Sequence, residues 1–306
     1  MMPSRRDVVA GAGGLLLAGL AAPAPALARH HRLMLGAFEV IVVSDGALSL
    51  PIGFVLPETP RAETDALFAA AGLDPARLQS QVNVMLVRTP TDLILIDAGG
   101  GADFMAGLGQ FPDALKAAGI EADKVTKVIF THAHADHLWG VIDDFDTSRY
   151  SGAPHLMSVS ELDYWRQPDL ASRLPEAFQA MAAGTARRLR MIDDLLKPAR
   201  PGDEIAPGVS LVDTSGHTPG HVSVLLTSGS EQLLIGGDVL TQSLVSFARP
   251  DWRWGADMDA AKAAASRRRT LDMLATDRIA LLGTHLPWPG LGRVERKDGV
   301  FRFVGA

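Results

Sequence analysis

The segment His132-Ala133-His134-Ala135-Asp136-His137 places three histidines and one aspartate within six residues. Imidazole and carboxylate groups are ligands for zinc, iron, manganese and cobalt. Because side chains two residues apart in an extended segment point to the same side, His132 and His134 can hold one ion together. Asp136 and His137 can then face a second ion, and the alanine spacers are too small to block either. The spacing therefore predicts a metal site.

A strand has to present these ligands. The apolar residues Val128-Ile129-Phe130 directly before the segment predict a buried strand, and Leu138-Trp139-Gly140 after it predicts a short helix or a turn. The ligands thus lie where a strand ends and the chain reverses. Such a position aims several side chains at one point from a rigid base.

The pattern H-x-H-x-D-H after a hydrophobic strand resembles the metallo-β-lactamase fold superfamily. In that family a later histidine, an aspartate after a hydrophobic strand and a last histidine near the end complete the site. This chain has all three in order, as His217, Asp238 and His285. The resemblance implies an α/β fold in which two sheets pack face to face with helices outside, a four-layer αβ/βα sandwich.

The resemblance also implies two divalent ions per chain, with zinc as the expected metal and manganese, iron or cobalt as alternatives. Seven ligands are assigned: His132, His134 and His217 to one ion, Asp136, His137 and His285 to the other, and Asp238 to both. Open coordination positions indicate catalysis rather than a structural role. Two ions about 4 Å apart can share a water whose pKa falls toward neutral, which supplies a hydroxide nucleophile. The implied reaction is hydrolysis, with Asp136 and Asp238 as its catalytic carboxylates.

Composition excludes several other classes of protein. Of 306 residues, 47% are hydrophobic, which suffices for one large core. The formal net charge of −6 offers no basic face for nucleic acid. The chain has no cysteine, so disulfides and thiolate metal sites are excluded.

The first 28 residues have the layout of a bacterial export signal. Ser4-Arg5-Arg6-Asp7 is a twin-arginine start, an apolar run follows at 8–22, and Ala26-Leu27-Ala28 is a small-x-small cleavage site. An uncleaved anchor is the alternative, but the run is short and glycine-rich for a spanning helix. We therefore expect a signal peptide at 1–28 and a hydrolase domain at 29–306. The mature protein is expected to be periplasmic or secreted, without a membrane association.

The remaining pattern predicts the elements of the two sheets and their helices. A strand, a turn at Ser44-Asp45-Gly46 and a second strand are expected within 38–50, and a loop with one short helix at 51–80. Further strands are expected at 82–88, 93–97, 125–130, 155–159, 209–213, 222–227, 232–236 and 278–283. Further helices are expected at 111–119, from a Ser160 cap, at 175–196 and at 260–275.

Four other features have competing interpretations. Asp97 precedes three glycines and either closes a plain turn or braces the metal loop, as an aspartate does in the family. His221 is expected in the core or behind the ligands rather than among them. His155 starts a strand. The run Arg267-Arg268-Arg269 is expected on a solvated helix face, opposite acids such as Asp272.

Over the whole mature chain, the sequence resembles the methyl parathion hydrolase family of exported dinuclear hydrolases. The resemblance is carried by Glu161-Leu162-Asp163-Tyr164-Trp165, by 216–221, by 249–254, by Gly283-Thr284-His285-Leu286-Pro287 and by 299–303. It implies hydrolysis of aryl phosphotriesters and aryl esters. The family's aromatic leaving-group pocket would fall on Phe104, Trp165 and Phe178, which are otherwise ordinary core aromatics. Trp252 and Trp254 would line the same mouth or form a contact in a homodimer.

Three functions remain open on the sequence. The first is the hydrolysis of aryl phosphotriesters and aryl esters. The second is a lactonase, such as an acyl-homoserine lactone hydrolase, with the same metal core. The third is an exported metal-binding protein without turnover, which a seven-ligand set with open positions disfavours. In the first two, the partner is a small ester, phosphotriester or lactone, and pocket shape rather than ligand identity decides between them.

Overall fold

The computed structural model describes residues 30–74 and 77–306. They form two seven-stranded mixed sheets in which the strands follow chain order. The first sheet contains β1 (His30–Leu35), β2 (Phe38–Pro51), β3 (Arg77–Arg88), β4 (Leu93–Ile96), β5 (Lys127–Ile129), β6 (His155–Ser158) and β7 (Leu196–Ala199). The second contains β8 (Glu204–Ala206), β9 (Val209–Asp213), β10 (Val222–Ser228), β11 (Glu231–Ile235), β12 (Ala280–Leu282), β13 (Leu291–Lys297) and β14 (Val300–Gly305).

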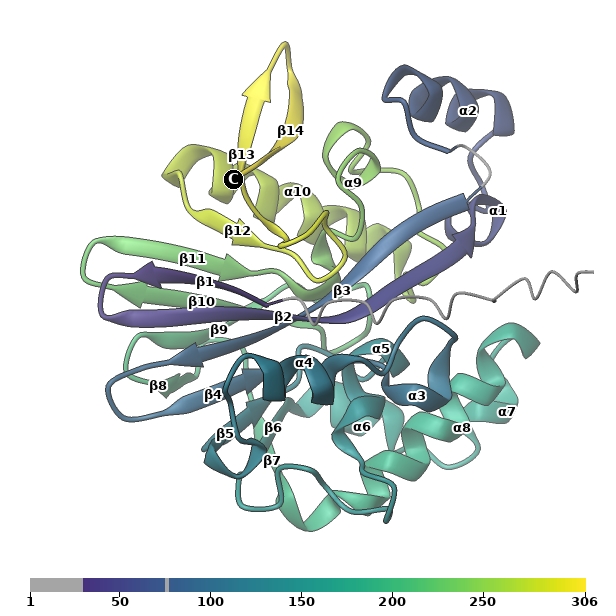
Figure 1. Cartoon of the computed structure of the whole chain (residues 1–306). Coiled ribbons are helices and arrows are strands. Elements are labelled where there is room, and N and C mark those ends of the chain that lie inside the picture. The colour runs from purple at the N-terminus through teal and green to yellow at the C-terminus, as the bar shows by residue number, and fades with distance from the viewer. Residues whose placement is uncertain (1–29, 75–76) are drawn as a thin grey trace, which may run out of the picture.

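Helices cover the outer face of each sheet (Figure 1). Those on the side of the first sheet are α3 (Gly101–Phe104), α4 (Phe111–Ala117), α5 (Ala135–Leu138), α6 (Val159–Trp165), α7 (Leu170–Arg173) and α8 (Glu176–Met191). The second sheet is covered by α9 (Val245–Ala248) and α10 (Ala260–Asp277). None of the described helices is long and apolar enough to cross a membrane.

Alternating side chains explain the layers. In β2, Val40 and Val42 pack with residues of the second sheet, whereas Ile41 and Val43 pack with the helices of the first. This period of two buries both faces of the strand at these positions, which is why Val40–Val43 is a continuous apolar run. Leu234 of β11 likewise packs with α10, on the opposite side from its neighbours Leu233 and Ile235. The predicted four-layer αβ/βα sandwich is confirmed.

The predicted turn at Ser44-Asp45-Gly46 is wrong, because β2 runs through it with a bulge. Gly46 has a φ of 121°, which lets the strand bend without ending. The Asp45 carboxylate accepts hydrogen bonds from the amides of Gly100, Gly109 and Phe111. Asp45 belongs to a residue type that is common in turns, but here it is a buried hydrogen-bond acceptor that fixes the loop before α4.

Helix boundaries differ from the expected ones in three places. The cap of α6 is Ser158, not Ser160, because the Ser158 hydroxyl accepts a hydrogen bond from the Glu161 amide. Helix α8 ends at Met191, five residues before the expected end. The expected loop at 51–80 contains two helices, α1 (Ile52–Val55) and α2 (Arg61–Ala70), and its last residues already belong to β3.

Candidate metal centre

The ligand-bearing loops follow the ends of strands from both sheets. His132 and His134 come after β5, and His217 lies between β9 and β10. Asp238 comes after β11, in the short helix η4 (Gly237–Val239), and His285 comes after β12. The parallel pairing of β11 with β12 brings the last two loops to the same edge.

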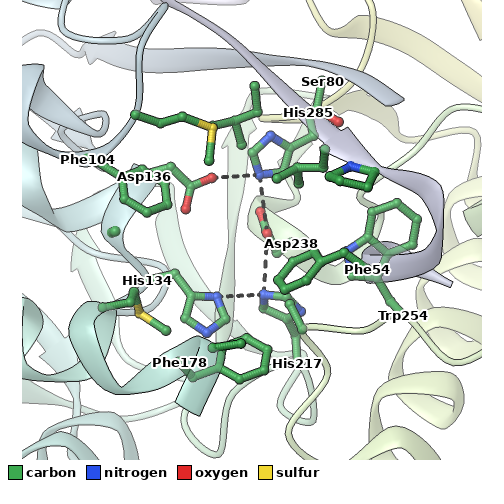
Figure 2. Close-up of a pocket in the computed structure, with 18 residues that line it drawn as sticks. Phe54, Ser80, Phe104, His134, Asp136, Phe178, His217, Asp238, Trp254 and His285 are labelled. Atoms are coloured by element: carbon green, nitrogen blue, oxygen red, sulfur yellow. Dashed lines mark hydrogen bonds and ion pairs between the residues drawn. The ribbon is translucent and has the colours of Figure 1, made fainter. Parts of the chain in front are cut away.

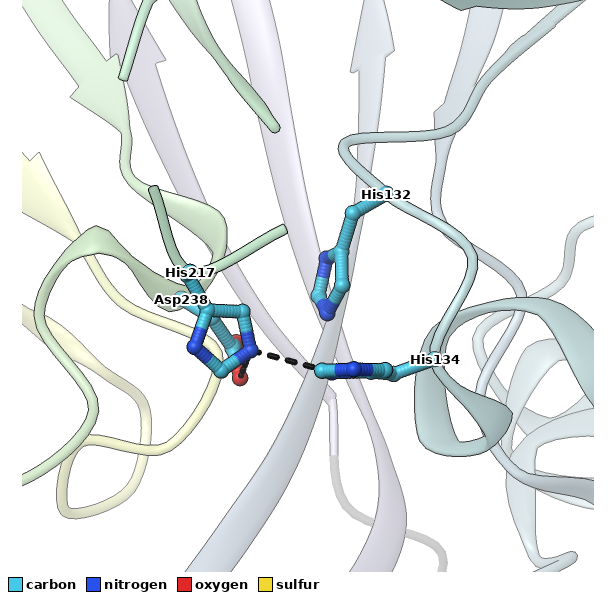
Figure 3. A group of neighbouring side chains, drawn as sticks. All are labelled: His132, His134, His217 and Asp238. Atoms are coloured by element: carbon cyan, nitrogen blue, oxygen red, sulfur yellow. Dashed lines mark hydrogen bonds and ion pairs between the residues drawn. The ribbon is translucent and has the colours of Figure 1, made fainter. Parts of the chain in front are cut away.

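The seven predicted ligands are brought together as two groups of buried donor atoms. One group is His132, His134, His217 and Asp238, and the other is Asp136, His137 and His285. Within each group the donor atoms lie within 4.8 Å of one another. Figure 3 shows the four side chains of the first group converging, with His132 and His134 on one loop and His217 and Asp238 on two others.

Asp238 contacts both groups. Its Oδ2 atom lies 3.3 Å from the Nε2 atoms of His217 and His285, and its Oδ1 atom lies 3.0 Å from Nε2 of His137. Nε2 of His285 also lies 3.2 Å from Oδ2 of Asp136. Figure 2 shows Asp238 between His217 and His285. The carboxylate is therefore in position to serve two ions at once.

The donor set fits metal ions better than it fits hydrogen bonding. Nε2 of His132 is buried without a hydrogen-bond partner, and Nε2 of His137 and Oδ1 of Asp238 lie 3.0 Å apart without forming a hydrogen bond to each other; this is unfavourable unless a cation satisfies these atoms. Nδ1 of His134 lies 3.0 Å from Nε2 of His217. Two nitrogens bound to one tetrahedral zinc are about 3.3 Å apart, so this spacing suits ligands of a shared ion.

Three of the ligands have protonation states that suit metal binding, namely His132, His134 and Asp136. Burial holds the pKa of His132 well below its usual value and lowers that of His134 to about 3, so both imidazoles are neutral. Burial opposes the charge of Asp136, but the nearby His137 and His285 still hold its pKa at about 2. Neutral imidazole and ionised carboxylate are the forms that ligate metals. By contrast, although burial opposes their charge, the nearby Asp238 carboxylate raises the pKa of His137 well above its usual value and that of His285 to about 10, so these two imidazoles would release a proton on binding an ion.

Outer hydrogen bonds orient three of the ligand histidines. Nδ1 of His137 lies 2.7 Å from Oδ2 of Asp97, which also accepts from Thr131, and Nδ1 of His285 lies 2.8 Å from the carbonyl oxygen of Gln81. Nδ1 of His217 lies 3.0 Å from Oδ1 of Asp257. Each acceptor fixes the N–H on Nδ1 and leaves Nε2 for a metal. Of the two interpretations of Asp97, the bracing contact is the one observed.

Asp257 was not predicted, and it overturns the expectation for Arg267. Arg267 is only 2% exposed, and its Nη2 atom donates to Oδ2 of Asp257 at 3.0 Å. The buried carboxylate needs this cation, so the first arginine of the run lies inside rather than on a solvated face. Asp272, the acid expected opposite the arginine run, forms an ion pair with Arg296 instead.

Two further buried histidines, His155 and His221, lie outside the ligand groups. Nε2 of His221 accepts the Asp238 amide at 2.9 Å, and its Nδ1 atom lies 2.8 Å from the Thr214 hydroxyl. His221 therefore supports the backbone of Asp238, as expected for a residue behind the ligands. His155 is buried between Ser148 and Ala153.

A cavity of about 360 Å³ opens onto both ligand groups. Phe104 and Phe178 line it, and so does Trp254, in agreement with the first of the two alternatives given for that residue; Phe54, which was not assigned to the pocket, lines it as well (Figure 2). Helix α1 carries Phe54, whose ring centroid lies 5.8 Å from that of Phe178. The walls are largely aliphatic and aromatic, so they favour an apolar substituent.

The expectation for Trp165 is wrong, because its side chain does not line this cavity. Trp165 is 1% exposed, and its indole N–H donates to Oε1 of Glu161 at 2.7 Å. Its ring meets that of His134 edge to face, with 5.9 Å between centroids. A buried indole takes the place where its N–H finds an acceptor, here beneath the ligand loop.

Comparisons with known proteins agree with this geometry. The family model of the metallo-beta-lactamase superfamily matches residues 77–283. A crystal structure of AidC, a dizinc quorum-quenching lactonase in complex with a homoserine product, is 27% identical with a TM-score of 0.86, covering 92% of this chain and 98% of that one. The hydrolase AbOPH in the β-lactamase superfamily is also 27% identical, with a TM-score of 0.85 and the same coverage.

A curated relative matches a shorter part of the chain. A probable metallo-hydrolase of Mycobacterium tuberculosis is 26% identical over 187 residues, which is 51% of this chain. The match covers 56% of that protein, so the chain spans about half the length of the relative.

Proposed function

We propose that this chain, which belongs to the metallo-β-lactamase superfamily, is a metal-dependent hydrolase that opens lactones carrying an apolar substituent. The observation that carries the proposal is the apolar cavity of about 360 Å³, which ends on both ligand groups. Similarity over nearly the full length to a dizinc lactonase supports the same substrate class.

Two ions held by the seven ligands would supply a water nucleophile and a Lewis acid for the carbonyl oxygen. The protein holds the charges that this requires. Asp136 and Asp238 stay ionised, and the buried imidazoles of His132 and His134 stay neutral. Phe54, with the other aromatic walls, excludes bulk water and orients the substituent away from the ions.

Hydrolysis of aryl phosphotriesters and aryl esters is the second candidate. It is favoured by the aromatic rings of Phe54, Phe104, Phe178 and Trp254 around one cavity, which suit a flat leaving group. Such leaving groups depart without a protonated general acid. The ligand groups do not discriminate between acyl and phosphoryl centres. Selection between the two kinds of substrate must therefore come from the side chains that line the cavity.

A substrate panel separates the two candidates. The purified protein, loaded with zinc or cobalt, is assayed for kcat/KM on an N-acyl homoserine lactone, an aryl ester and an aryl phosphotriester. A preference of about tenfold or more for the lactone, about 1.4 kcal/mol in the barrier, is expected. The opposite order would favour the second candidate, and absence of turnover on all three would favour a non-catalytic metal-binding protein.

Phe178→Ala is expected to lower kcat/KM for the aryl substrates by about tenfold. An aromatic contact contributes about 0.5–1.5 kcal/mol beyond the area it buries, and the lost area adds to this. A short aliphatic lactone has no ring to stack and should lose less. Phe145→Ala, at a position that is 85% exposed, serves as the control for losing a phenylalanine. Equal losses on aryl and aliphatic substrates would place Phe178 in a general structural role.

We also propose export by the twin-arginine route, which rests on residues outside the described part of the chain. Replacing Arg5 and Arg6 with lysine should leave the precursor in the cytoplasm, because the receptor reads the arginine pair. Fractionation of cells with an antibody measures this, with the unaltered precursor as the control. Unchanged export of the variant would contradict the proposal. The mature chain would begin at Arg29.

A further inference from the structure

Glu161 lies in the third position of α6, where its carboxylate does not make the expected local contact. Ser158 and Glu161 have the S-x-x-E spacing of a capping box, in which the glutamate normally turns back to the amide of the cap residue. Ser158 does cap the helix by accepting from the Glu161 amide. The Glu161 side chain, however, is fully buried, and its carboxylate accepts hydrogen bonds from Ala133, Trp165, Thr218 and Gly220 instead of from the Ser158 amide.

The Glu161 carboxylate joins two separate loops. Its Oε1 atom accepts from the Ala133 amide at 2.9 Å and from the Trp165 indole at 2.7 Å. Its Oε2 atom accepts from the Thr218 hydroxyl at 2.7 Å and from the Gly220 amide at 2.9 Å. Four donors converge on one carboxylate, two on each oxygen.

Both loops carry ligands of the first group. Ala133 lies between His132 and His134, and Thr218 directly follows His217. A Cβ atom added at Gly220 would lie 2.1 Å from the Glu161 amide nitrogen, so the loop packs directly against the start of α6.

The second ligand group is braced by other residues. His137 is oriented by Asp97, and His285 is oriented by the carbonyl of Gln81. The four hydrogen bonds to the Glu161 carboxylate come from Ala133, Trp165, Thr218 and Gly220, and none of these residues belongs to the second group. The two groups therefore have separate supports.

We propose that Glu161 is a positioning residue that holds His132, His134 and His217 at the spacing one ion requires. It touches neither substrate nor metal, and the inference rests on the proposed function only in assuming two ions per chain. Glutamine would keep the size of the side chain but would replace one acceptor oxygen with an amide that is itself a donor. Two of the four donors would then face the glutamine NH₂ group, which cannot accept their hydrogen bonds, and one of the two loops would no longer be anchored to α6.

Glu161→Gln in the full chain is tested by stripping the metal and titrating zinc against a competing chelator. Affinity for one ion should fall by about 10- to 100-fold, as is common for outer-shell partners, while the other affinity stays close to that of the unaltered chain. The visible spectrum of the cobalt-loaded variant should change in the bands of one site. Asp163→Asn is the matched control, because it removes an exposed carboxylate from the same helix.

A second pair of variants identifies the weakened site. The double variant Glu161→Gln/His132→Ala should bind metal with the same affinity as His132→Ala alone, since both changes act on the first group. Adding His285→Ala should leave no tight site. Additive losses with His132→Ala would contradict the proposal.

The alternative outcomes are distinct. Unchanged affinities with a lower unfolding temperature of the metal-free variant would make Glu161 a structural residue only, and equal weakening of both sites would also overturn the proposal. If Glu161→Gln does not fold, Thr218→Val removes one donor and should weaken the same site by a smaller factor; unchanged affinity would then contradict it. Fewer than two ions in the unaltered chain, or no hydrolysis, would count against the proposed function instead.

Discussion

Replacing Asp238 with asparagine is expected to remove most of the hydrolytic turnover and to leave the fold intact. The Asp238 carboxylate contacts members of both ligand groups, His217 on one side and His137 and His285 on the other. Asparagine keeps the shape but removes the negative charge that two cations would share. We therefore expect a loss greater than the roughly 10- to 100-fold that outer-shell partners contribute.

The fold should tolerate this change because the backbone of Asp238 is held independently. Its amide donates to Nε2 of His221, and this hydrogen bond does not involve the carboxylate. The measurement is kcat on the best substrate of the panel, with metal content and circular dichroism recorded on the same preparation. Asp272→Asn, which removes a surface carboxylate paired with Arg296, is the control. Near-normal turnover in Asp238→Asn would reject a bridging role for Asp238.

His132→Ala and His285→Ala should each bind one ion per chain where the unaltered protein binds two. The two residues belong to different groups of converging donor atoms, so each change opens one site. Losing one of three or four ligands strongly lowers the affinity of the site for its ion, because the remaining atoms no longer complete the coordination of that ion.

Elemental analysis after dialysis against metal-free buffer gives the stoichiometry directly. His30→Ala is the control, because His30 lies on the exposed edge of β1. The double variant should bind no ion tightly. A single tight ion in the metal-replete unaltered protein would contradict the two-ion interpretation, and loss of both ions in either single variant would show that the groups are not independent.

The ligand set could be predicted because its information is local. Four of the seven candidates lie within six residues, where residue type and spacing alone define a metal motif. The remaining three follow apolar or glycine-bearing runs that a resemblance to a known family places in order. The sandwich architecture was predictable for a related reason, since Val40–Val43 of β2 and the whole of β4 are buried on both faces and are therefore continuously apolar.

The supports and the pocket were not predictable, because they depend on residues far apart in the chain. Asp257 meets His217 across 40 positions, and Glu161 meets Gly220 across 59. Nothing in the types or neighbours of these carboxylates distinguishes them from surface acids. The sequence around Arg267 predicts a solvated helix face, because its buried partner Asp257 is not among the acids that a helical spacing would place beside it.

Trp165 and Phe54 show the same limit for the pocket. Both are aromatic, and sequence alone does not say which ring faces a cavity. Trp165 carries an N–H that must find an acceptor when buried, and Glu161 provides one beneath the ligand loop. Phe54 reaches the cavity only because α1 packs on the segment near Val245 and Trp254. The sequence alone determined which side chains can bind metal, through their chemistry and short spacing. Only tertiary packing decided which others hold them in place and which line the cavity, because those contacts form between segments that fold together from distant parts of the chain.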